Sequence, residues 1–146
     1  LAGDKPSKEA FLHLAMYRSR PNEGAIVHLH STYSVAVSCL ADIDPDDVLP
    51  PITAYYVMRV GHLPLVPYFA PGDKDLAEHV EQVALRTRVM LLSNHGPVVA
   101  ARNLDGAVYA TEEHEETARL YLMLRDMPTR FLTPAQVAEL RERFPS

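Results

Sequence analysis

The segment 88–101, RVMLLSNHGPVVAA, limits the possible folds more than any other part of this sequence. Two short apolar runs flank an Asn94-His95-Gly96 turn, a pattern that predicts two strands joined as a hairpin. The hairpin favours at least one antiparallel pair of strands. Because helical and strand patterns are mixed along the rest of the chain, we predict an α/β or α+β domain.

Several helices are predicted from apolar periodicity and from residues that commonly cap helix ends. The last of them begins with a threonine followed by proline, and proline is well tolerated in the first turn of a helix. The predicted helices are 8–20 with Ser7 as the cap, a segment ending near 85 with Asp73 as the cap, 103–127, and 133–144 with Thr133 as the cap and Pro134 after it.

Two further strands are predicted outside the hairpin. Segment 25–30, AIVHLH, is short and rich in β-branched residues, as strands commonly are. Segment 63–68, LPLVPY, reads as an edge or connecting strand, because proline cannot donate a backbone hydrogen bond to a central strand. The segment between them, residues 31–41, either continues the first strand or forms a helix. The helix is favoured, because Ser31 and Thr32 are residue types that commonly cap helix starts.

Composition excludes some classes of function. The chain has 146 residues and a net charge of −5, so it is a poor candidate for nonspecific binding to nucleic acid or to an anionic membrane. No apolar run reaches the roughly 18 residues of a membrane span, and residues 1–10 show no signal-peptide core. The only cysteine, Cys39, cannot form an intrachain disulfide, so we expect a cytoplasmic protein with Cys39 as a small buried apolar residue.

Two histidines interrupt the predicted strand 25–30. Residues i and i+2 of a strand project from the same face, so His28 and His30 should point the same way. Two such imidazoles can bind one divalent cation, and catalytic zinc commonly has three protein ligands. His95, at the end of a predicted strand, is the best candidate for the third. The alternative interpretation of each of these three histidines is a structural role, in which hydrogen bonds hold the ring in place.

Other polar residues near the predicted metal site have two interpretations. Glu9 either stabilises the start of the first helix or transfers protons beside the metal. Ser7 and Lys8 stand at the same helix start and suit an anion such as phosphate, although Lys8 alone is also compatible with ordinary surface charge. The remaining histidines are interpreted as structural or solvent-exposed: His13, His62, His79 and His114, the last within the charged run EEHEE.

Four segments in order resemble the class II aldolase/adducin family: KPSKE, AIVHLHSTYSVAV, LLSNHG and NLDGAVYATEEHEETARLYL. The resemblance covers almost the whole chain and implies a three-layer α/β/α sandwich around a mostly antiparallel sheet, often in homotetramers. It also implies that His28, His30 and His95 bind a divalent metal, with Zn²⁺ expected because they match the zinc ligands of this family's aldolases. Glu9 then matches the acid/base carboxylate, and Ser7 a phosphate-contacting serine.

Within that family, KPSKE and AYYVMRVGHLPLVPY most resemble the 3-oxo-tetronate 4-phosphate decarboxylases. Lys8 stands where the aldolases usually have a second serine, and it would join Ser7 in binding phosphate. The resemblance implies that a small phosphorylated sugar acid is converted to dihydroxyacetone phosphate and CO₂ through a metal-stabilised enediolate. The alternatives are a sugar-phosphate aldolase of the fuculose or rhamnulose type and a non-enzymatic, adducin-like binding module. We expect residues 1–146 to form one such domain that lacks its N-terminal part.

Overall fold

The structure is a computed structural model that describes residues 6–70 and 72–145. Lys5 of the KPSKE segment and Pro71 therefore lie outside the described residues. Six helices and four strands are present in the described part of the chain. In order they are α1 (Ala10–Ser19), β1 (Ala25–His28), α2 (Thr32–Ser38), α3 (Ala54–Arg59), β2 (Leu65–Val66), α4 (Asp75–Ala84), β3 (Val89–Leu92), β4 (Gly96–Ala101), α5 (Leu104–Leu124) and α6 (Pro134–Arg143).

The four strands form one sheet with the order β1-β4-β3-β2. β3 and β4 pair antiparallel across the Asn94-His95-Gly96 turn, which confirms the predicted hairpin. β1 is antiparallel to β4 and places His28 opposite Val98, whereas β2 is parallel to β3. β2 lies at the edge of the sheet, as the prolines around it predict. The sheet is therefore mostly antiparallel.

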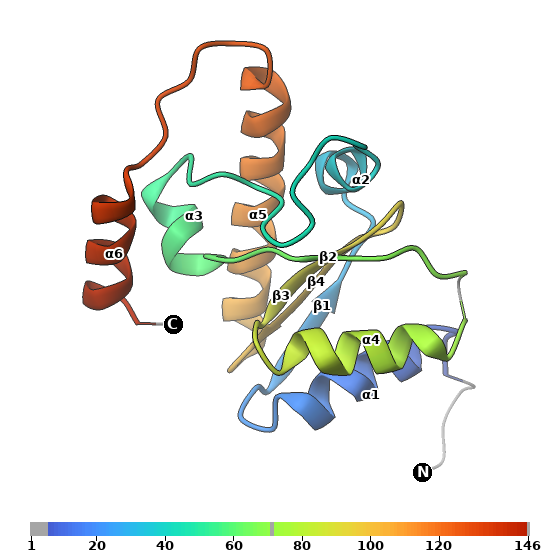
Figure 1. Cartoon of the computed structure of the whole chain (residues 1–146). Helices are drawn as coiled ribbons and strands as arrows, with labels where there is room; N and C mark the ends of the chain where they lie inside the picture. The colour runs from blue at the N-terminus through green and yellow to red at the C-terminus, as the bar shows by residue number, and fades with distance from the viewer. Residues whose placement is uncertain (1–5, 71, 146) are drawn as a thin grey trace.

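Helices cover both faces of the sheet (Figure 1). Along β3, Met90 and Leu92 belong to one apolar cluster, together with residues of α1 and α4. Val89 and Leu91 belong to the other, together with residues of α2, α3 and α5. Alternate side chains of a strand point to opposite faces, so a strand buried on both sides is apolar throughout. The predicted three-layer α/β/α arrangement is confirmed.

Several boundaries differ from those predicted. The first helix begins later, at Ala10, with Glu9 rather than Ser7 in the N-cap position. The first strand ends at His28, two residues earlier than predicted, since Ser31 is already the N-cap of α2. A helix after Ser31 is confirmed. The capping prediction at Thr133 is also confirmed, since Thr133 and Gln136 form a reciprocal capping box.

One prediction about burial is corrected, and the structure decides between two alternatives for another residue. Cys39 is exposed, because α2 ends at Ser38 and Cys39 follows it on the surface. His114 lies in a charged run but has an exposed fraction of 0%. It lies on the face of α5 that packs against the core, where buried residues recur every three or four positions. His114 is therefore structural rather than solvent-exposed. In the described part of the chain, no helix is both long and apolar enough to cross a membrane.

Candidate functional site

His28 stands at the end of β1 and is held in one tautomer. Its Nδ1 lies 2.8 Å from the carbonyl oxygen of Pro97, which can only accept, so Nδ1 carries the proton. Nε2 is then a free acceptor, and it is buried without a hydrogen-bond partner. Burial lowers the pKa of His28 and outweighs the opposing effects of the Pro97 hydrogen bond and the Glu9 charge. A neutral imidazole with a fixed, unpaired lone pair is suited to metal ligation.

His95 is held by the turn between β3 and β4. Asn94 has a φ of 55°, a left-handed conformation that asparagine tolerates better than most residues. Its backbone N–H donates to the carbonyl of Ser38 at 3.3 Å, and its side-chain amide donates to the sulfur of Cys39 at 3.2 Å. The end of α2 therefore fixes the turn that presents His95.

Close backbone packing brings His30 to the same place. The β4 strand begins at Gly96, where a Cβ atom would lie only 2.2 Å from the carbonyl oxygen of Leu29. Without a side chain there, the segment that carries His30 can pass directly beside the turn that carries His95. The ring centroids of His30 and His95 are consequently 4.7 Å apart.

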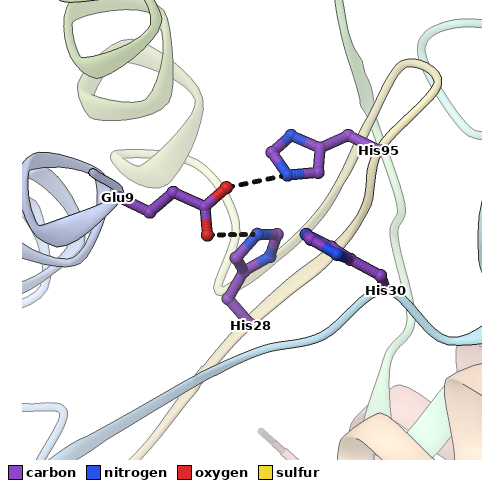
Figure 2. A group of neighbouring side chains, drawn as sticks. All are labelled: Glu9, His28, His30 and His95. Atoms are coloured by element: carbon purple, nitrogen blue, oxygen red, sulfur yellow. Dashed lines mark ion pairs between the residues drawn. The ribbon is translucent and has the colours of Figure 1, made fainter. Parts of the chain in front are cut away.

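Glu9 reaches this cluster from the start of α1. It occupies the N-cap position, but its side chain makes no capping hydrogen bond. Its carboxylate instead lies 2.9 Å from His95 Nε2 and 3.5 Å from His28 Nε2. Figure 2 shows the carboxylate directed at these two rings, with the ring of His30 beside them. The Glu9 side chain therefore does not cap α1 in this structure.

The four side chains converge from three separate parts of the chain. One ligand atom from each lies within 4.8 Å of all the others, close enough to hold one metal ion after small side-chain adjustments. Three imidazole nitrogens and a carboxylate oxygen are a common ligand set for zinc and for several other divalent metals. The buried, unpaired Nε2 of His28 supports this interpretation, because a metal would supply the missing partner.

A cavity of about 620 Å³ opens beside the cluster. Glu9, His30 and His95 line it, so a molecule bound there would contact the candidate ligands. Nothing in the sequence indicated that the other lining residues belong to this site, because they lie in α2, after β2 and in the turn before β4, outside the metal-site pattern. They are Thr32, Val35, Tyr68, Phe69 and Asn94.

The remaining predicted residues lie at varying distances from this site. Ser7 and Lys8 are exposed at the chain segment leading into Glu9, and the structure gives them no side-chain partner among the described residues. Their role in binding phosphate stays a prediction. The ring centroid of His13 lies 6.4 Å from that of His28, and His13 is not one of the four clustered residues. His62 and His79 are exposed outside the four-residue cluster, as predicted.

Comparison with known proteins gives consistent matches. The sequence profile of the Class II Aldolase and Adducin N-terminal domain matches residues 1–122. A 3-oxo-tetronate 4-phosphate decarboxylase from Escherichia coli K12 is 52% identical over 141 residues, covering 97% of this chain and 66% of the relative. An L-fuculose phosphate aldolase from the same strain is 33% identical over 146 residues, covering 97% of this chain and 65% of that protein.

A solved structure supports the same relationship. The crystal structure of YgbL from Escherichia coli, described as an aldolase, epimerase or decarboxylase, superimposes with a TM-score of 0.93 at 50% identity. The alignment covers 97% of this chain and 68% of YgbL. For comparison, the chain spans 66% of the length of the K12 decarboxylase, which is slightly less than two thirds.

Proposed function

Because the chain belongs to the Class II Aldolase and Adducin N-terminal domain family, we propose that its protein is a metal-dependent decarboxylase of a 3-oxo-tetronate 4-phosphate. The products would be dihydroxyacetone phosphate and CO₂. The convergence of Glu9 with three histidines carries this proposal. The relative that is named for this reaction and is 52% identical supports the choice of substrate.

His28, His30 and His95 would hold the metal ion, with zinc as the proposed metal. The ion would act as a Lewis acid that stabilises negative charge on substrate oxygens, an effect worth several kcal/mol. The fixed tautomer of His28 keeps its free nitrogen directed into the site, so no rearrangement of that ring is needed. Imidazole ligands add no negative charge to the metal, which favours an anionic substrate.

The cavity beside the cluster would hold the substrate. Its volume of about 620 Å³ suits a small metabolite. Ser7 and Lys8 would bind the phosphate by hydrogen bonding and charge and thereby fix the position of the reacting carbons. Tyr68 and Asn94 line the same cavity and would contact the substrate.

Decarboxylation breaks the bond between C1 and C2 of the substrate. CO₂ departs, and the electron pair of the broken bond is delocalised from C2 onto the oxygen at C3. C2 must then gain a proton, and the protonated carboxyl group of Glu9 would donate it. In the structure the Glu9 carboxylate is next to His95 and His28, at the edge of the cavity, as a proton donor there must be.

Two alternative functions remain distinct from this proposal. A sugar-phosphate aldolase would use the same charge stabilisation to break a different carbon–carbon bond and release an aldehyde. Lys8 in place of a second serine and the higher identity to the decarboxylase favour decarboxylation. A non-enzymatic, adducin-like module has no need for convergent ligands, so the cluster argues against it.

The proposal extends to the state of the protein in the cell. We propose a homotetramer, by analogy with the family, and a reducing cytoplasm, which suits an exposed and unpaired thiol at Cys39. Size-exclusion chromatography with light scattering tests the first. A tetramer mass supports it, and a monomer mass contradicts it.

The enzymatic proposal is tested with the full-length protein. A 3-oxo-tetronate 4-phosphate is supplied, and released CO₂ and dihydroxyacetone phosphate are measured in equal amounts. His30→Ala should lose both bound metal and turnover, whereas Glu9→Gln should retain metal and lose turnover by about 100-fold or more. His62→Ala, an exposed histidine outside the cluster, is the matched control. Aldehyde release from L-fuculose 1-phosphate without CO₂ release from the sugar acid would overturn the proposal.

A further inference from the structure

Arginines gather at the end of the sheet opposite the metal-site cluster. β1 runs toward His28, so the residues before it lie at the far end. Since β4 is antiparallel to β1, the residue after β4 lies at that same end, and so does the residue before β3. Two cavities open there, with volumes of about 570 and 660 Å³, and both are lined by Arg20, Arg88 and Phe144.

Positive charge dominates the lining of these cavities. Six arginines line one or both of them, and among the residues that the structure describes Glu23 is the only acidic one that does so. The clustering is local, because the whole chain has a net charge of −5. The six are Arg20, Arg59, Arg86, Arg88, Arg102 and Arg141.

Most of this charge is not neutralised within the described part of the chain. Arg20 forms an ion pair with Glu23 at 3.2 Å. The other five arginines have no carboxylate partner among the ion pairs of the described residues. Burial and the nearby charges of Arg20 and Arg102 lower the pKa of Arg88, against the opposing effect of Glu23. Crowded guanidinium groups of this kind would be stabilised by a bound anion.

Backbone carbonyls hold three of the guanidinium groups in place. Arg88 donates to the carbonyl of Arg59 at 2.9 Å, Arg141 to that of Gly61 at 3.3 Å, and Arg20 to that of Ala84 at 3.4 Å. A guanidinium group has five N–H donors, so each retains others for a ligand. Arginine binds phosphate through pairs of such donors, and positioning them in advance lowers the entropy that binding costs.

The shape of the site favours a small molecule over a protein partner. Both cavities fall within the 300–1,000 Å³ typical of small-molecule sites. Aromatic side chains contribute to the wall of the larger one: Tyr55 is 61% exposed and Phe144 is 48% exposed. An organic ligand could pack its apolar part against them while its anionic groups meet the arginines.

We propose that this arginine-lined site binds a small organic molecule with two or more phosphate charges, apart from the metal-site cluster. The residues expected to contribute most are Arg88, which is half-buried between the two cavities, and Arg102, which follows β4 at the rim of the larger one. Because neither residue lies near the four-residue cluster, the proposal does not depend on the reaction that the cluster performs.

Calorimetric titration of the full-length, metal-loaded protein with ADP tests this proposal. Arg102→Gln and Arg88→Gln should each weaken ADP binding by about tenfold or more, since each removes a charge-assisted contact. Arg119→Gln is the matched control, because Arg119 is an exposed arginine paired with Glu116 elsewhere on the surface, and it should leave binding unchanged. His30→Ala should also retain ADP binding.

Several results would overturn the proposal. They are no measurable ADP binding, equal binding by the wild type and Arg102→Gln, or loss of ADP binding in His30→Ala, which would place the nucleotide at the metal-site cluster. Arg102 is exposed, so its substitution should not disturb folding even if that of the half-buried Arg88 does. If an acidic polyglutamate peptide binds in preference to ADP, the natural ligand of this site is a protein partner and not a small molecule.

Discussion

Replacement of Gly96 by alanine tests whether close backbone packing assembles the metal-site cluster. Gly96 has a φ of 154°, and a Cβ atom there would lie 2.2 Å from the carbonyl oxygen of Leu29 and 3.3 Å from Cα of His30. Ordinary contact begins near 3.4 Å. The start of β4 and the Leu29–His30 segment would therefore have to separate by roughly 1 Å, as overpacked sites do. His95 precedes Gly96 directly, so this movement would pull His30 and His95 apart.

The expected size of the effect follows from two contributions. Overpacking typically costs about 1–3 kcal/mol of unfolding free energy, and an unfavourable backbone conformation adds on the order of 1 kcal/mol or more. Metal ligation is more sensitive, because ligand distances must be met to within about 0.2 Å. A displacement of roughly 1 Å between two ligands should therefore weaken metal binding by about 100-fold, as comparable misplacements do in active sites.

Gly72→Ala is the matched control for this experiment. Gly72 also has a positive φ, 92°, but a Cβ atom there would meet no atom of the described residues within 4 Å. Both variants carry backbone strain, and only Gly96→Ala forces two segments apart. Zinc affinity is measured by competition with a chromophoric chelator, and unfolding free energy by urea titration. If Gly96→Ala binds zinc as tightly as Gly72→Ala, close packing at Gly96 does not position the ligands.

Three further predictions concern stability. His114 is fully buried and its pKa is lowered to about 4, chiefly by burial, so the unfolded chain takes up a proton near 6.5 while the folded protein does not. The unfolding free energy should therefore fall by about 3 kcal/mol as the pH drops from 6.5 toward 4, and urea titrations should show this loss greatly reduced in His114→Leu. Glu115 accepts hydrogen bonds from the backbone of Tyr33 at 2.9 Å and from the Ser34 hydroxyl at 2.6 Å, so Glu115→Ala should cost about 2 kcal/mol in the same assay, and a wild-type value would contradict this role. Zinc at about 100 times its Kd should raise the unfolding free energy of the wild type by about 2.7 kcal/mol, and an equal increase in His30→Ala would exclude the proposed site.

Much of the fold was predictable from local sequence. The apolar runs around Asn94-His95-Gly96 predicted a hairpin, and the structure contains that hairpin at the centre of the sheet. The capping signal located the start of α6 at Thr133, because a hydroxyl that satisfies a free backbone N–H acts within a few residues, and Ser31 is the N-cap residue of α2 although its side chain makes no capping hydrogen bond. The signal at Ser7 did not locate the start of α1, where Glu9 occupies the cap position and binds histidines instead.

The charged run around His114 shows where local sequence was insufficient. Four glutamates flank this histidine, yet Glu113 and Glu115 hydrogen-bond to Thr53 and Ser34, and the imidazole faces the core. Which side of a helix faces inward depends on the elements that pack against it. The exposure of Cys39 likewise depends on where α2 ends relative to the sheet, which its apolar neighbours did not indicate.

The sequence by itself determined which residue types were available at the candidate site. A period of two places His28 and His30 on one side of an extended segment. The positions of His95 at a strand end and Glu9 at a helix start made them candidates, and resemblance to a family gave them roles. Only the tertiary structure decided that these four groups come within 4.8 Å of one another. It did so because β1 pairs with β4, Gly96 admits a second backbone, and α1 packs beside β1. The arginine-lined cavities arise in the same way, since antiparallel pairing brings to one end of the sheet side chains that are far apart in the sequence.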